Sequence, residues 1–143
     1  MQTDLLTGVA VLLQNAGIGT WNTTGVYSGG QTGIVLGNVP QNPDRIITLT
    51  AYQVSDAPAL SDSVLGIQVR CRWGGQDKRN VDDLADDIFK LLHGKTALSL
   101  STGVTIVQCL RQSAASLGQD SNNRWSVVQN FYADVHYPST NRT

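Results

Sequence analysis

The chain has 143 residues, of which 41% are hydrophobic and only 15% charged, with a formal net charge of −1 at pH 7. This length suits one domain that buries about two thirds of its unfolded surface without disulfide or metal cross-links. The charge argues against a nucleic-acid binder that neutralises phosphates, since such proteins are usually strongly basic, and no apolar run approaches the roughly 20 residues that span a bilayer.

The first predicted element is an amphipathic helix from Thr3 to Ala16. Its apolar residues recur at helical spacing and are Leu5, Val9, Leu12, Leu13 and Ala16. Thr3 or Asp4 can cap the first backbone amides, and Gly17 can end the helix in a left-handed conformation. The first four residues lack the positive charge of a signal peptide, so we expect a cytoplasmic protein.

A long glycine-rich segment from Gly17 to Asp44 follows, with seven glycines. Loops beyond about 12–15 residues are uncommon in compact domains and are usually functional or disordered. Trp21 and Tyr27 lie in this loop and either fold back onto their own domain or dock on a neighbouring subunit, where such aromatics are enriched. The short apolar run from Gly33 to Leu36 could add an edge strand.

Two strands are predicted next, from Arg45 to Gln53 and from Val64 to Trp73. The second strand alternates cleanly, with Leu65, Ile67, Val69, Cys71 and Trp73 on the inner face and Gln68, Arg70 and Arg72 on the outer face.

The second predicted helix runs from Asn80 to His93, with Asn80 as its N-cap. Its buried positions are Val81, Leu84, Ala85, Ile88, Leu91 and Leu92. Four acidic residues crowd its first half: Asp82, Asp83, Asp86 and Asp87. They complement the helix dipole, and because no second element offers an oxygen cluster, a solvated or intersubunit acidic face is favoured over a metal site.

The last third predicts a hairpin of strands from Val104 to Ser113 and from Arg124 to Tyr137, joined by a long polar turn. Together these elements predict one α+β domain over 1–143, with a four- to five-stranded, mostly antiparallel sheet and two helices packed on one face.

No constellation of catalytic residues is visible. His93 and His136 lack a recognisable nucleophile, and the glycines spell neither GxGxxG nor a Walker loop. Cys71 and Cys109 lie within strands and are expected as buried, reduced thiols. We therefore expect no enzyme, cofactor or metal. A small-molecule or carbohydrate-binding module would use its tryptophans, but Trp73 and Trp125 are expected in the core, which leaves only Trp21.

Three arginines, Arg70, Arg72 and Arg124, lie on the polar side of the strands. They are either solvated or meet a partner through charge-assisted contacts, for which the acidic helix of the next copy is a candidate. Such head-to-tail contacts between unlike patches form a closed ring when the rotation from one copy to the next divides a full turn evenly.

The order of four segments resembles the tail terminator (tail completion) proteins of long-tailed bacteriophages, a group also labelled minor capsid proteins. The segments are the helix Leu5–Ala16, the loop ending in Leu36–Asp44, the strand and helix Leu65–Trp73 and Val81–Leu92, and the turn Gly118–Arg124 leading into Asn130-Phe131. Together they cover most of the chain.

The resemblance implies a structural virion protein that assembles in the host cytoplasm as a homo-oligomer, a hexameric ring. Such a ring caps the head-proximal end of the tail tube, stops its polymerisation and joins the tail to the head, while DNA passes through without specific binding. Its partners would be the tail tube protein and a head–tail connector. The alternative is a head-closure or neck connector protein. The predicted axial docking residues lie in the hairpin turn and are Gly118, Asp120, Asn122 and Asn123.

Overall fold

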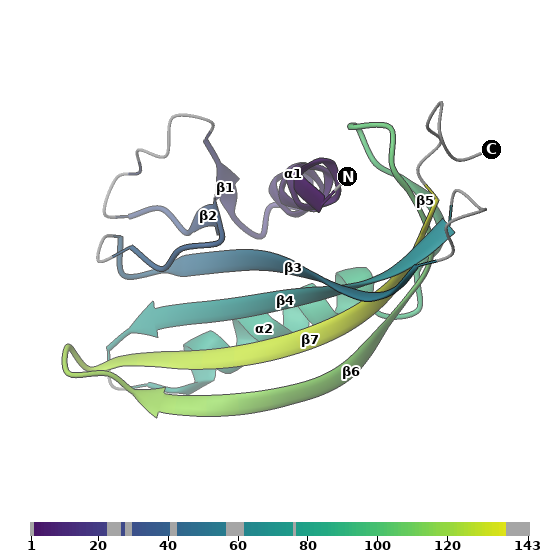
Figure 1. Cartoon of the computed structure of the whole chain (residues 1–143). Coiled ribbons are helices and arrows are strands. Elements are labelled where there is room, and N and C mark those ends of the chain that lie inside the picture. Colours follow the sequence, from purple (N-terminus) through teal and green to yellow (C-terminus); the bar gives the residue numbers. More distant parts are fainter. Residues whose placement is uncertain are drawn as a thin grey trace.

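The computed structural model describes residues 2–22, 27, 30–40, 43–56, 62–75 and 77–136. The elements are α1 (Gln2–Asn15), β1 (Thr20–Trp21), β2 (Gly33–Leu36), β3 (Ile46–Asp56), β4 (Asp62–Gly74), α2 (Arg79–Leu92), β5 (Thr96–Ser99), β6 (Thr105–Gln119) and β7 (Arg124–His136). All the strands belong to one curled sheet in the order β1-β2-β3-β4-β7-β6-β5 (Figure 1).

The sheet has seven strands and is mixed, so the prediction of four or five mostly antiparallel strands was wrong. β1, β2 and β3 pair in parallel, whereas the remaining neighbours are antiparallel. β1 and β2 lie within the glycine-rich segment that the sequence predicts mainly as a loop. β2 coincides with the run Gly33–Leu36 that could add an edge strand, although β1 lies beyond it in the sheet. Gly33 permits close packing there, because a Cβ atom at this position would lie 3.1 Å from both Ile46 Cδ1 and Tyr27 Cγ. Strands of two to four residues are too short to show a hydrophobic period.

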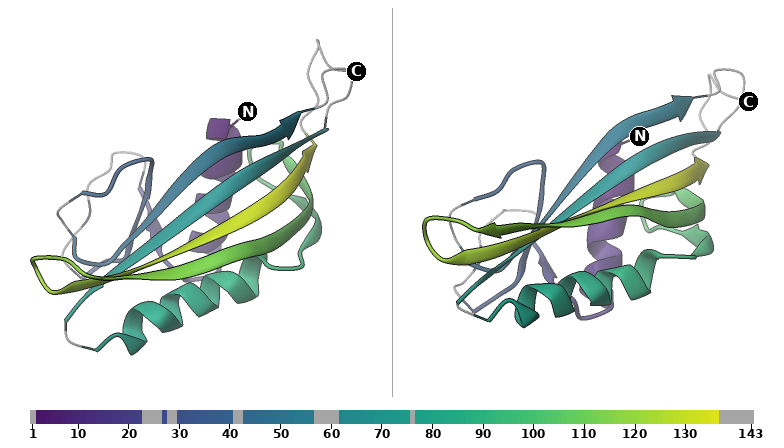
Figure 2. Two further views of the ribbon diagram at one scale, coloured as in Figure 1. Left: turned by 60° about the horizontal axis from the view of Figure 1, so that its bottom comes forward. Right: turned by 90° about the horizontal axis from the view of Figure 1, so that it is seen from below.

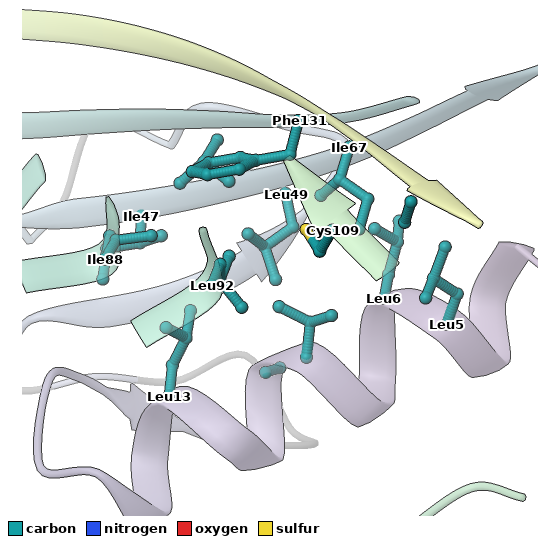
Figure 3. Packing of buried hydrophobic residues seen from close by; sticks show 14 of the residues in the cluster. Leu5, Leu6, Leu13, Ile47, Leu49, Ile67, Ile88, Leu92, Cys109 and Phe131 are labelled. Atoms are coloured by element: carbon teal, nitrogen blue, oxygen red, sulfur yellow. The ribbon is translucent and has the colours of Figure 1, made fainter. Parts of the chain in front are cut away.

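The long strands β3, β4, β7 and β6 curl around α1 and α2 (Figure 2). α2 runs along the strands, whereas α1 is seen end-on in Figure 1 and crosses their direction. One hydrophobic cluster joins both helices to the inner face of the sheet. Figure 3 shows Leu5, Leu6 and Leu13 of α1 and Ile88 and Leu92 of α2 beside Ile47, Leu49, Ile67 and Phe131 of the sheet. The α+β character and the two-helix core thus hold, although the sheet is larger than expected.

The two cysteines are confirmed as buried, free thiols. Burial raises the pKa of Cys71 and of Cys109 to about 12. Each sulfur therefore remains protonated at neutral pH and packs as a small apolar group.

Helix α2 begins at Arg79, so the prediction of Asn80 as its N-cap was wrong. Lys78 occupies the cap position and makes no side-chain capping bond. Instead, the Arg79 amide donates to Asp77 Oδ1 at 3.0 Å. The acceptor therefore lies one residue further from the helix than a standard capping residue.

The hairpin between β6 and β7 is also tighter than predicted. Residues 113–119 continue β6 as strand, with register shifts near Arg111/Ser113 and Ser116/Gly118, and only residues 120–123 form the turn. The sequence hides this extension because its small and polar side chains are largely exposed on both faces of the strand, which gives no alternation.

Gly8 sets how closely α1 approaches the turn before β6. A Cβ atom at Gly8 would lie 2.7 Å from Leu100 Cβ and 3.0 Å from Thr102 Oγ1. The Thr102 hydroxyl donates to the Asp4 carbonyl at 2.5 Å. Helix and turn are therefore in direct contact over the first half of α1.

We predict that Gly8→Ala lowers the free energy of unfolding, by about 1–2 kcal/mol, because overpacking outweighs the gain in helix propensity. Urea unfolding followed by circular dichroism measures the change. Thr7→Ala, at the neighbouring half-buried position, serves as the control and should be close to neutral. A Gly8→Ala variant more stable than the wild type would show that the helix and turn can separate at little cost.

Candidate assembly surfaces

Segments far apart in the sequence meet at one end of the sheet. The turn between β6 and β7 and the start of β3 lie at the same end of the sheet in Figure 1. The Arg124 Nη1 atom lies 3.7 Å from Asp44 Oδ1, which links the base of the hairpin to the residues before β3. We call this the hairpin end of the molecule.

Arg72, one of the three arginines predicted on the outer face, is only 3% exposed. Its Nε donates to the Asp44 carbonyl at 3.0 Å and its Nη2 to the Pro43 carbonyl at 2.7 Å. Burial lowers the pKa of the Arg72 guanidinium, and the nearby Arg124 adds to the shift. Arg72 therefore fixes the chain that enters β3.

Arg124 is likewise buried and bonded within the chain. Its Nε donates to Asp120 Oδ2 at 2.9 Å, and its backbone amide donates to Asp120 Oδ1 at 3.0 Å. The same Oδ1 accepts the Asn122 amide at 2.9 Å. The hydrogen bond from the Arg124 amide is the main cause that lowers the pKa of Asp120 from its ordinary value. The predicted docking turn is thus a compact structure organised around one carboxylate.

Arg70 differs from the other two arginines. It is half-buried on the outer face, and within the described part of the chain its Nε has no hydrogen-bond partner and its side chain forms no ion pair. Of the three predicted interface arginines, Arg70 is therefore the one whose guanidinium is not held by a described hydrogen bond or ion pair within the chain.

The four aspartates of α2 separate into two pairs. Asp82 bonds Lys78 at 3.0 Å and Asp86 lies 3.3 Å from Lys90, both as i,i+4 ion pairs on the helix surface. Asp83 and Asp87 form no ion pair with any described residue and line a cleft of about 770 Å³. Ile18, Trp73, Leu84 and Leu91 are among the other residues that line it. The cleft between the end of α1 and α2 therefore combines apolar walls with two carboxylates outside the described ion pairs, and Lys90, which pairs with Asp86, also lines it.

The two aromatic residues of the glycine-rich segment contact their own chain. The Trp21 amide donates to Gln14 Oε1 at 2.9 Å, and the indole packs against the core. The Tyr27 hydroxyl donates to the Ile34 carbonyl at 2.5 Å. Trp73 and Trp125 are cross-strand neighbours that also lie against the core.

The remaining predicted docking residues lie on or next to the turn. Gly118 is in β6, with φ of 76°, and Asn123 ends the turn with φ of 61°. Asp120, Asn122 and Asn123 are exposed. The structure therefore brings these residues together at the tip of the hairpin.

An apolar band crosses the outer face of the sheet, and sequence analysis missed it. Tyr52, Gly66, Tyr132 and Leu110 are consecutive cross-strand partners from β3 to β6. The Tyr52 ring lies over Gly66, where a Cβ atom would be only 2.1 Å from Tyr52 Cζ. Tyr132 is 38% and Leu110 36% exposed. Only the strand register places these residues side by side.

Among the described residues, no group of three or more His, Cys, Asp or Glu side chains is arranged to hold a metal ion. No helix within the described ranges is long and apolar enough to cross a membrane.

A family model described as bacteriophage tail terminator protein matches residues 12–137. No curated protein matches the sequence. A chain in the solved structure titled "Virion of native gene transfer agent (GTA) particle" is 18% identical, with a TM-score of 0.55, and the match covers 71% of this chain and 78% of that chain. At this identity the likeness concerns the fold alone.

We predict that Asp120→Asn flattens the dependence of stability on pH in the acid range. A depressed pKa in the folded state gives stability that is present above the unfolded pKa and is lost as pH falls through the folded value. The wild type should therefore lose stability below about pH 4, and the variant should lose less of it. The neutral amide oxygen can still accept the turn amides.

Urea unfolding at pH 7 and at pH 3 measures this difference. Ser121→Asn leaves the carboxylate in place and should keep the wild-type pH dependence. Identical acid dependence in wild type and Asp120→Asn would show that the turn carboxylate contributes nothing to acid stability.

Proposed function

Because this chain belongs to the bacteriophage tail terminator family, we propose that it forms a ring that caps the head-proximal end of the tail tube. The ring would end tube polymerisation and provide the surface that joins the tail to the head. The protein is a structural component of a phage-like virion, and the family match over residues 12–137 is the observation that carries the proposal. The matched residues run from the second half of α1 to just beyond β7.

A ring of identical copies, for which we propose six, needs two unlike lateral surfaces and two unlike axial faces. The fold supports this requirement because its two ends differ. The hairpin end carries the compact turn, whereas β5 lies at the opposite end (Figure 1).

We assign the hairpin end to axial docking on the tail tube protein or the head–tail connector. The turn projects there as a rigid tip, and the cleft between the end of α1 and α2 offers two carboxylates over apolar walls. Its complement would be a basic segment of the docking protein with an apolar side chain. The net charge of −1 suits a ring through which DNA passes without being held.

We predict that the purified protein forms rings by negative-stain electron microscopy, alone or when mixed with purified tail tubes. The rings should sit at one end of the tubes. A chain that stays monomeric by light scattering at high concentration, with and without tubes, would contradict the proposal. Binding to portal or adaptor rings, with none to tubes, would identify a head-closure protein instead.

We predict that the double variant Asp83→Asn, Asp87→Asn weakens axial docking by about ten-fold, since it removes the two carboxylates of the cleft. Co-sedimentation with tail tubes or connector rings at several salt concentrations measures the loss. Asp82→Asn, Asp86→Asn is the matched control, with the same change in net charge on the same helix. Equal losses in the two double variants would point to net charge rather than to the cleft.

A further inference from the structure

The edge of the sheet formed by β6 is only partly covered. β5 pairs with residues 105–108 of β6, and the Cys109 amide donates to the Lys95 carbonyl at 3.0 Å. The side chain of His93 then accepts the Arg111 amide at 3.0 Å and ends this cover. From 112 to 119, no described residue outside β7 pairs with the strand as a neighbouring strand.

This open edge has register shifts near Arg111/Ser113 and Ser116/Gly118 but lacks the stronger forms of protection. Long exposed edges are normally blocked by charged side chains, proline or a covering element, because their unpaired backbone groups accept foreign strands. Residues 112–119 contain no charged residue and no proline. Leu117 is 50% exposed. Such an edge promotes aggregation of a free protein, whereas in an assembly it can pair with a neighbouring copy.

A second open edge lies at the opposite corner of the sheet. β2 covers β3 only from Ile46 to Leu49, and within the described chain no strand lies beside 50–56. In the register of the sheet, Ile46 lies in one row with Gly118, whereas Tyr52 lies in one row with Leu110. The two open segments therefore occupy diagonal corners.

We propose that residues 112–117 of β6 in one copy pair with residues 50–55 of β3 in the next copy. This rests on the proposed ring and specifies its lateral contact. Three successive antiparallel pairings separate β3 from β6, so a copy that continues the sheet with the same face outward presents its β3 antiparallel to β6. The contact is heterologous, as ring closure requires.

The diagonal placement is compatible with a closed ring. When Ala51 of one copy opposes Ser116 of its neighbour, the copies are shifted by roughly 14 Å along the strands, at about 3.4 Å per residue. Across the sheet, β3 of one copy lies four strands from β3 of the next copy, a distance of about 19 Å at roughly 4.8 Å per strand. In a flat ring, neighbouring copies lie at the same height along the ring axis. The shift along the strands then requires the strands to tilt by about 35° from that axis, within the range of roughly 35–45° seen in closed sheets.

Edge pairing also accounts for the arginines better than a contact between the sheet face and the acidic helix. Arg72 and Arg124 are already bonded within the chain, so Arg70 is the one of these three arginines left for a contact through the outer face. A ring joined through backbone groups does not use that face. Arg70→Glu should therefore leave ring formation unchanged, whereas a face-to-helix ring would lose it.

Paired cysteines test the contact directly. Ala51 and Ser116 both lie on the inner side of the sheet, in the rows of Phe131 and Val127, whereas Ala115 lies on the outer side in the row of Val128. Ala51→Cys with Ser116→Cys should give a ladder of disulfide-linked oligomers after mild oxidation. Ala51→Cys with Ala115→Cys is the matched control and should not, since opposed residues of paired strands share one face. The native thiols are buried.

Blocking the edge provides a second measurement. By strand alternation the Ala114 amide points away from β7, so Ala114→Pro removes a donor from the open edge. We expect it to weaken assembly by about ten-fold relative to Ala114→Val, which keeps the amide. Circular dichroism establishes that both variants are folded, and light scattering measures their assembly.

The outcomes separate this contact from the function. Rings that form without cross-links in either cysteine pair, and that tolerate Ala114→Pro as well as Ala114→Val, would overturn edge pairing and leave the ring intact. Loss of rings in Arg70→Glu alone would favour the face-to-helix contact. Absence of rings from the wild type, with or without tail tubes, would overturn the proposed function and the contact together.

Discussion

Thirteen cross-strand pairs join β4 to β7 without a register shift, from Asp62 opposite His136 to Gly74 opposite Arg124. This pairing decides which face of the sheet each side chain occupies, because a slip of one residue would exchange the two faces. On the inner face it places Ile67 beside Phe131, in the core shared by both helices. Gln129, also on that face, donates to the Ala85 carbonyl of α2 at 2.8 Å and accepts from Arg111 at 3.2 Å. The position of α2 thus depends on the central pair.

The same pair explains why the margins of the sheet are uneven. β3 and β6 are long because each follows one side of this pair, but their outer neighbours β2 and β5 have only four residues each. The core is complete without longer neighbours, since α1 and α2 already cover the inner face. The hydrophobic core is therefore complete, whereas parts of the edges of β3 and β6 are not covered by a described neighbouring strand. A partner strand can add to these edges without rearranging the core.

Sequence analysis predicted the elements with regular periods and offered the short run Gly33–Leu36 as a strand, but it missed β1 and β5. The alternation of β4 and the apolar stripe of α2 located both, because many buried side chains repeat at one spacing. β1 and β5 are too short for any period, and the parallel pairing of β1, β2 and β3 makes the sheet mixed. The roles of the charged residues could not be read from spacing either. Asp82 and Asp83 are adjacent in the chain, yet the first pairs with Lys78 and the second lines the cleft.

The arginines show why a charge pattern alone is a poor guide to an assembly surface. Arg72 and Arg124 look like surface cations in a strand pattern, but their guanidinium groups bond backbone carbonyls and the Asp120 carboxylate. Their charges therefore build the hairpin end. Backbone groups at an open edge also impose direction and register, which exposed ion pairs do not. A ring needs every copy to meet the next at one angle and one stagger, and strand pairing supplies both constraints through the geometry that already holds the domain together.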